Sequence, residues 1–173
     1  MDSTFSRLNI IICSFIISLA CCAFGNFLSS FIYTETFSSN VTLNSVLDLG
    51  ISPYLRNDHA NVALNISSDL SKIPQWNTNQ LFLFIFVSYN NNSKRNFVTI
   101  WDNIVSVNNN NMIYSMDGVI NKYPIRDIGN SLRGRKFEIN IAYCYMPIVG
   151  RIHYRYQYGE KSYFLPKKYF RYS

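Results

Sequence analysis

The run Leu81-Phe82-Leu83-Phe84-Ile85-Phe86-Val87 decides which fold class this chain adopts. Seven consecutive apolar residues are too few for a helix that crosses a membrane, which needs about 20. A short continuous apolar run between polar segments is typical of a strand inside a sheet. We therefore expect a central strand that is covered on both of its faces.

Other segments alternate apolar and polar residues with the two-residue period of half-buried strands. Val62, Leu64 and Ile66 follow this pattern, and so do the residues from Phe137 to Cys144. Short strands separated by Asn- and Gly-containing turns, without a convincing amphipathic helix, indicate an antiparallel arrangement. The sequence predicts a mostly β protein with one β-sandwich-like domain over residues 34–173.

For two further strands, the sequence predicts which side chains lie on the same face. In one strand, alternation places Phe97, Thr99 and Trp101 on one face, opposite Val98, Ile100 and Asp102. In residues 151–158, the tyrosines are expected to form a buried face and the basic residues a solvated one.

The first 33 residues contain a long apolar segment, with no charged side chain between Arg7 and Glu35. One helix over residues 8–33 would be roughly 39 Å long at about 1.5 Å per residue, enough to cross a hydrocarbon core of about 30 Å. Two interpretations stay open at this point. The segment is either an uncleaved transmembrane anchor or a signal peptide cleaved near residues 22–25, which would release a secreted or cell-surface binding module.

Charge distribution predicts the orientation of this segment. Arg7 precedes the apolar run, while Glu35 and Asp48 follow it. Because positive charge stays on the cytoplasmic side, residues 1–7 are expected in the cytoplasm and residues 34–173 in a lumenal or extracellular space.

Three N-glycosylation sequons fit that compartment, and they begin at Asn40, Asn65 and Asn91. Asn91 is the best candidate acceptor because it lies in an expected turn. Cys144 is the only cysteine beyond the apolar run, so no internal disulfide is expected and Cys144 should be a buried strand residue.

The sequence offers little that could carry catalysis. His59 and His153 are the only histidines, and no spacing of Cys and His suits a zinc site. Ser115-Met116-Asp117-Gly118 is interpreted as an Asp-Gly turn rather than the setting of a nucleophilic serine. We expect no catalytic residue, no metal and no cofactor.

The positive charge is concentrated in the C-terminal third of the chain. Residues 118–173 hold eleven Lys or Arg and three Asp or Glu, out of a net charge of +6 for the whole protein. In residues 151–171, tyrosines beside cations could suit RNA, but the expected compartment argues against nucleic acid. A solvated basic face is the preferred interpretation, with contact to lipid phosphates or an acidic partner as the functional alternative.

Three segments resemble a known family. Residues 68–84, SDLSKIPQWNTNQLFLF, resemble the D-L-x-x-x-x-x-W-N-x-x-Q-L-F-L signature of the signal peptidase complex subunit 3 family. Residues 98–105, VTIWDNIV, are similar to its W-D-x-I-V strand, and residues 127–135, DIGNSLRGR, to its G-N-x-L-x-G turn. The segments occur in the family's order and spacing, after the same short charged start and apolar segment.

The resemblance implies a non-catalytic subunit in the endoplasmic reticulum membrane. It implies that residues 8–33 are an uncleaved single span in contact with membrane lipid, with a cytoplasmic N-terminus and a lumenal β domain. It also implies a separate catalytic serine peptidase subunit and small membrane subunits as partners.

The motif residues are expected to have structural or interface roles. Trp76 and Trp101 are expected to be core anchors, because a buried indole needs a partner for its N–H and each is followed by a hydrogen-bonding residue. The Gly129-Asn130 pair is expected to form a left-handed turn. The full set consists of Trp76, Asn77, Gln80, Trp101, Asp102, Gly129, Asn130 and Gly134.

Overall fold

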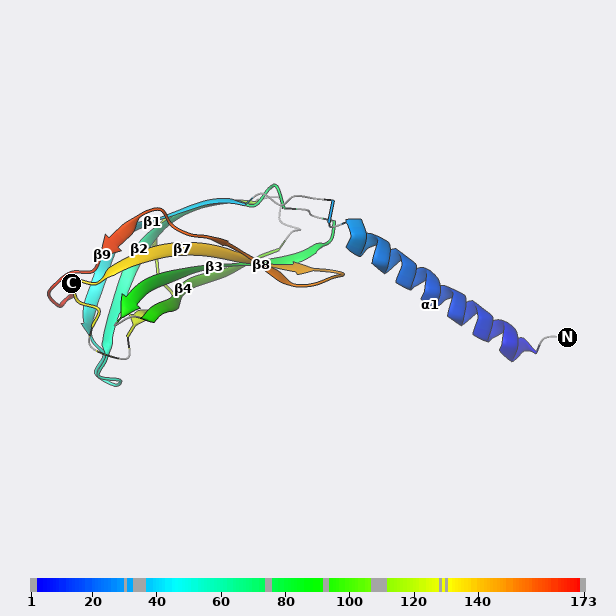
Figure 1. Ribbon diagram of the computed structural model, residues 1–173, viewed down its shortest axis with the longest axis horizontal. Coiled ribbons are helices and arrows are strands. Elements are labelled where there is room, and N and C mark those ends of the chain that lie inside the picture. The colour runs from blue at the N-terminus through cyan, green and yellow to red at the C-terminus, as the bar shows by residue number, and fades with distance from the viewer. Residues whose placement is uncertain are drawn as a thin grey trace.

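Two antiparallel sheets pack face to face, and a helix projects from one end of the pair in the computed structural model (Figure 1). The structure describes residues 3–29, 31–32, 37–73, 76–91, 94–106, 112–127, 129 and 131–171. Within these residues the elements are α1 (Thr4–Ser29), β1 (Ser38–Ile51), β2 (Asp58–Asp69), β3 (Thr78–Asn91), β4 (Lys94–Ser106), β5 (Ile113–Ile120), β6 (Ile125–Arg126), β7 (Lys136–Pro147), β8 (His153–Gln157), β9 (Ser162–Phe164) and β10 (Phe170–Arg171).

Every strand pairing in the described part is antiparallel. The first sheet has the order β10-β1-β2-β5, and β6 also pairs with β2. The second sheet has the order β4-β3-β7-β8, and β9 also pairs with β7. The predicted mostly β sandwich with an N-terminal helix is confirmed.

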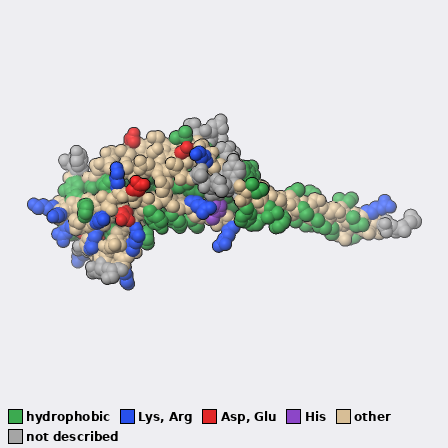
Figure 2. All heavy atoms as spheres, turned by 45° about the horizontal axis from the view of Figure 1, so that its top comes forward, with side chains coloured by type: hydrophobic (Ala, Val, Ile, Leu, Met, Phe, Trp, Pro, Cys, Tyr) green, Lys and Arg blue, Asp and Glu red, His purple; other side chains and the backbone are tan. Residues whose placement is uncertain are grey.

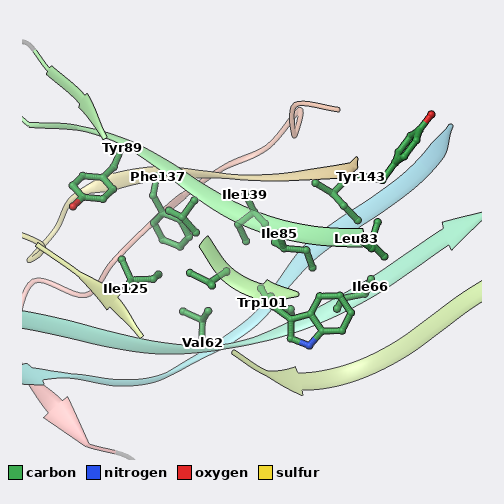
Figure 3. Packing of buried hydrophobic residues seen from close by; sticks show 14 of the residues in the cluster. Val62, Ile66, Leu83, Ile85, Tyr89, Trp101, Ile125, Phe137, Ile139 and Tyr143 are labelled. Carbon is green, nitrogen blue, oxygen red and sulfur yellow. The ribbon is translucent and has the colours of Figure 1, made fainter. Parts of the chain in front are cut away.

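Inward-facing side chains of both sheets form one hydrophobic core (Figure 3). Val62 and Ile66 of β2 lie opposite Leu83 and Ile85 of β3, and all four are almost completely buried. Each such side chain contributes about 1.5–3 kcal/mol of transfer free energy. Burial at every second residue therefore fixes which face of each sheet is internal.

Strand β3 is central, as expected, but it is covered on one face only. Leu81, Leu83 and Ile85 are fully buried, whereas Phe82 and Phe84 are partly exposed on the outer face. No described helix or sheet lies over that outer face. The outer phenylalanines of the run pack on one another instead, with the ring centroids of Phe82 and Phe84 stacked 5.7 Å apart.

A β-bulge overturns the expected facing of residues in β4. Ile85 pairs with Trp101 and the next β3 residue, Phe86, pairs with Thr99, so the register shifts by one residue. Ile100 and Trp101 are consequently both buried. Strict alternation is thus lost at the bulge, and Phe97, more than half exposed, does not share a face with Trp101.

The aromatic face of β8 is exposed, contrary to expectation. Tyr154 and Tyr156 are each 53% exposed on the outer side of the sheet. The opposite side of β8 carries the polar Gln157, whose side chain reaches the first sheet. Its Oε1 accepts from the Ser39 N–H at 3.0 Å, and its Nε2 donates to the Ser39 carbonyl at 2.7 Å.

Two smaller expectations have different outcomes. Cys144 is a buried strand residue, as predicted. The Asp117-Gly118 pair does not reverse the chain: it lies inside β5, where the β2–β5 register shifts, and the Gly118 N–H donates to Asn65 Oδ1 at 2.9 Å.

Helix α1 begins four residues before the expected span of 8–33 and ends at Ser29. It is long and apolar enough to cross a membrane, and none of its residues is buried. Figure 2 shows hydrophobic side chains along the whole helix and basic side-chain atoms only near its free end, where Arg7 is the helix's one charged residue. Such a surface, exposed outside any protein core, fits a transmembrane or signal-anchor helix.

Candidate functional site

The outer face of the second sheet carries a cluster of aromatic side chains that no described element covers. We define the aromatic face as Phe82, Phe84 and Phe86 of β3, Phe97 of β4, and Tyr154 and Tyr156 of β8. The Tyr156 ring contacts Phe84 and Phe86 edge-on, at centroid distances of 6.5 and 6.2 Å. Phe86 also contacts Phe97 at 5.9 Å.

Strand pairing explains why these rings meet. Phe82 and Phe84 pair with Cys144 and Ala142 of β7, and those two residues pair with Tyr154 and Tyr156 of β8. Directly opposed residues point to the same side of a sheet, so small β7 side chains separate aromatic residues on both flanks. The face is therefore hollowed along β7.

Two hollows lie on this face. One, of about 320 Å³, is lined by Phe84, Phe86, Phe97, Thr99, Tyr156 and Tyr158. The other, of about 520 Å³, is lined by Phe82, Phe84, Thr99, Asp102, Tyr123, Cys144, Met146 and Tyr154. Exposed apolar surface with hollows that can receive anchoring side chains is typical of protein–protein interaction sites.

Ion pairs border the aromatic face. Asp102 accepts a hydrogen bond from Lys122 Nζ at 3.1 Å, and this ammonium lies 5.6 Å from the Trp101 ring centroid. At another edge, Arg95 pairs with Glu138 at 2.9 Å. An apolar centre with a polar rim is the usual anatomy of an interface. Asp102 thus lies on this surface, whereas its neighbour Trp101 is a core residue, as expected.

The Trp-Asn pair of the first motif joins the helix to the sandwich. Asn77 is buried, and its Oδ1 accepts from Asn26 Nδ2 at 3.0 Å and from the Val149 N–H at 3.1 Å. Its Nδ2 donates to the Val149 carbonyl at 2.9 Å. Trp76 is 46% exposed and donates from Nε1 to Ser29 Oγ at 3.3 Å, so the expectation that Trp76 is a core anchor is wrong.

Of the motif residues not yet placed, three lie within the described part of the chain. Gln80 is exposed on β3, and Gly129 is exposed in the loop before β7. Gly134 has a φ of 61°, and its N–H donates to the Pro166 carbonyl at 2.9 Å. Asn130 lies outside the described residues.

Buried carboxylates underlie that loop, and the motif comparison did not single them out. Asp58 accepts from the Leu132 N–H at 3.0 Å and from the Tyr169 hydroxyl at 2.8 Å. The hydrogen bond to Asp58 raises the pKa of Tyr169. Asp127, also buried, accepts from Tyr89, Asn91 and Ser131. Multiple donors compensate the burial of each carboxylate, which indicates a structural role.

The sequons differ in accessibility. Asn40 is exposed on β1, whereas the Asn65 side chain accepts from Gly118. The Asn91 amide donates to Asp127 at 3.3 Å, so the preferred candidate is already engaged within the domain. Exposure favours Asn40 over Asn91, and the use of any of the three stays a prediction.

Basic side chains gather at the end of the sandwich away from α1, and a smaller group lies near the junction (Figure 2). A hollow of about 570 Å³ at the far end is lined in part by Arg95, Arg133, Arg135 and Lys136. This charge lies at the surface, outside residues 151–171, for which the solvated basic face was expected.

The described residues contain no arrangement suited to catalysis. Ser115 pairs with Ser67 on β2, eight residues from His59, which corresponds to roughly 26 Å at about 3.3 Å per residue. His59 pairs instead with Asp48 at 3.2 Å. In the other sheet, the His153 ring packs at a tilt on Tyr145, with a centroid distance of 4.6 Å. No described group of three or more His, Cys, Asp or Glu could hold a metal ion.

A sandwich with an apolar N-terminal helix and a hollowed aromatic outer face has the features of a helix-bearing docking module. Comparison with known families gives this class a name. The model of the Signal peptidase subunit family matches residues 1–168, and the chain belongs to that family.

Individual relatives agree with this assignment. Signal peptidase complex subunit 3 of Gallus gallus is 31% identical over 157 residues, covering 87% of this chain and 86% of the relative. The Homo sapiens protein of the same name is 29% identical with the same coverage, and the Dictyostelium discoideum protein is 27% identical over 98% of this chain and 97% of its own. Spo0M, a sporulation control protein from Bacillus subtilis, aligns with a TM-score of 0.27 at 9% identity, covering 77% of this chain and 50% of that one, which is too distant to bear on the fold.

Proposed function

We propose that this chain acts in the signal peptidase complex by holding the catalytic serine peptidase subunit against its aromatic face. The family match over residues 1–168 carries the first part of this conclusion: the chain is a non-catalytic subunit of the complex in the endoplasmic reticulum membrane. The aromatic face supports the second part. The alternative of a secreted binding module is not favoured, since the family and the relatives covered over 86–97% of their length are subunits of the signal peptidase complex.

The proposed mechanism is positional. Helix α1 would cross the membrane with residues 1–7 in the cytoplasm, which places the β domain in the lumen. The contacts of Asn77 with Asn26 and Val149 support a fixed position of the sandwich relative to the helix. A catalytic subunit docked on the sandwich would then be held at a constant height above the bilayer, where the apolar part of a signal peptide ends. Small membrane subunits would complete the assembly within the bilayer.

Features of the aromatic face support a protein partner. Tyrosine and phenylalanine bury large contact areas at low cost in side-chain entropy, and such residues dominate interface energetics. Lipid is less suitable than protein as a cover for the whole face. The face carries the Lys122–Asp102 and Arg95–Glu138 ion pairs at its edges, and acyl chains cannot solvate such charges. We assign the face to the catalytic subunit's lumenal domain.

Affinity purification of the tagged full chain from detergent-solubilised membranes tests this proposal. The wild-type chain should co-elute with a serine signal peptidase subunit, and its absence would overturn the assignment of the partner. Tyr156→Asp and Phe97→Asp should weaken co-elution, because each replaces an exposed ring of the aromatic face with a charge next to the buried Phe86 ring.

Tyr54→Asp is the matched control, since Tyr54 is 94% exposed in the turn between β1 and β2 of the other sheet. It should leave co-elution unchanged. Normal co-elution of Tyr156→Asp and Phe97→Asp would reject the aromatic face as the docking surface while leaving membership of the complex intact.

A further inference from the structure

The tip of the β7–β8 hairpin lies beside the C-terminal end of helix α1 (Figure 1). A Cβ atom placed on Gly150 would lie 3.1 Å from Cδ2 of Phe27, so the tip backbone packs directly on this helical ring. Gly150 also has a φ of 129°, a conformation that residues with side chains rarely adopt. Both features make glycine the suitable residue at this contact.

Asn77 connects the same tip to the helix through hydrogen bonds. Its backbone carbonyl accepts from the Ile148 N–H at 2.8 Å, and its side chain holds both backbone groups of Val149. The same side chain accepts from Asn26 of the helix. The hairpin tip is therefore held at a defined level along the helix axis.

The length of α1 indicates which level this is. Arg7 is the only charged residue of the helix, and a hydrocarbon core of about 30 Å takes up about 20 residues. A hydrocarbon segment that begins at Leu8 would therefore end near Phe27, the residue that contacts Gly150. The hairpin tip then lies at the boundary between acyl chains and headgroups.

The surface chemistry around this contact matches that boundary. Ile148 and Ile152 are 64% and 53% exposed, and Trp76 lies at the junction, where its indole donates to Ser29 of the helix. Arg151, between the two isoleucines along the hairpin, is also exposed. Tryptophan and apolar residues next to a long cationic side chain are typical of membrane interfaces, where apolar groups meet acyl chains and the guanidinium meets phosphate.

We propose that the β7–β8 hairpin tip and Trp76 form a second membrane contact, which lies in the lipid headgroup region beside the helix. The inference rests on the membrane-spanning role of α1 but not on docking at the aromatic face. The contact would resist tilting of the sandwich about the end of the helix, because one span alone fixes only one point of attachment.

Fluorescence of the full chain reconstituted into phosphatidylcholine vesicles tests this contact. Ile152→Trp in a Trp76→Phe background adds a reporter at the tip, and the Trp76→Phe chain gives the emission of buried Trp101 for subtraction. We expect blue-shifted emission from residue 152 that is quenched more by lipids brominated near the headgroup than by lipids brominated at the chain end. Arg151→Glu in the same background should reduce this quenching.

Phe164→Trp in the Trp76→Phe background is the matched control, because Phe164 is exposed on β9, at the end of the sandwich away from α1. Its emission should respond to aqueous acrylamide and not to brominated lipid. If residue 152 behaves like residue 164 while the chain resists alkaline extraction from the vesicles, the hairpin inference is wrong and the span assignment stands. Loss of the whole chain on alkaline washing would instead contradict the span, and with it the inference.

Discussion

Asn26 of the helix donates a hydrogen bond from its Nδ2 to Oδ1 of Asn77 in the sandwich, at 3.0 Å. These two residues are 51 positions apart, and their contact connects the two parts of the molecule. Asn77 belongs to the Trp-Asn motif, so a family signature marks the place where the helix meets the β domain. The motif residue thus has a physical role that its position in the sequence alone did not reveal.

Replacement of Asn77 should destabilise the protein. Asn77→Ala removes the partners of both backbone groups of Val149 at a buried position, which should cost about 1–3 kcal/mol in the free energy of unfolding. Thermal unfolding of the full chain in detergent measures this. Asn44→Ala, at an exposed position of β1, should change stability by less than about 0.5 kcal/mol. If Asn77→Ala and Asn44→Ala lowered the free energy of unfolding by the same amount, the Asn77 contacts would contribute nothing to stability.

The adjacent residues Trp101 and Asp102 should differ sharply in their contributions. Trp101 is 4% exposed, and Trp101→Ala should cost about 3–5 kcal/mol because it opens a cavity in the core. Asp102→Ala removes a surface ion pair and should cost about 0.2–1 kcal/mol. Chemical unfolding and co-purification should be measured on both. A stable Trp101→Ala chain that no longer binds its partner would instead make Trp101 an interface residue.

Processing of precursors should not depend on the candidate catalytic residues. Ser115→Ala, His59→Ala and His153→Ala should each leave signal-peptide cleavage near normal in cells. In the described structure Ser115 on β5 is far from His59 on β2, and His153 lies on β8 of the other sheet. Accumulation of the variant chain has to be verified by immunoblot. A strong loss of cleavage with Ser115→Ala in a fully assembled complex would instead identify Ser115 as a nucleophile.

Stability should fall at high pH through Tyr89. Burial, followed by the nearby Asp127 carboxylate, raises the pKa of Tyr89 to about 12 from its ordinary value of 10.0. The folded chain holds this proton more tightly than the unfolded chain, so the stabilisation is complete below pH 10 and is lost as the pH rises from about 10 to about 12. Unfolding measured across this range should show a steeper decline for wild type than for Tyr89→Phe. Parallel curves would contradict the prediction.

The topology can be examined in sealed microsomes. Protease added outside should leave almost the whole chain intact, since only residues 1–7 are expected in the cytoplasm. Detergent should then expose a C-terminal tag to digestion. Digestion of the tag without detergent would place the β domain on the cytoplasmic side, and a mature N-terminus near residues 22–25 would indicate cleavage.

The sequence alone determined the main architecture. The apolar segment without charge after Arg7 predicted the helix, because its length and composition suit a membrane irrespective of the folded domain. Period-two patterns around Val62 and Ile139 predicted strands, since burial on one face of a sheet requires apolar residues at every second position. The three motifs identified the family, because their order and spacing do not depend on knowing the fold.

Only the tertiary structure decided which surfaces face outward. The run from Leu81 to Val87 is equally apolar on both sides, so pattern could not show that Phe82 and Phe84 lack a covering layer. The one-residue bulge opposite Phe86 reverses the facing of Phe97 relative to Trp101, and no local sequence rule locates a bulge. The exposure of Trp76 and the bond from Asn26 to Asn77 likewise depend on contacts between segments about fifty residues apart, and such contacts form only when the whole chain packs.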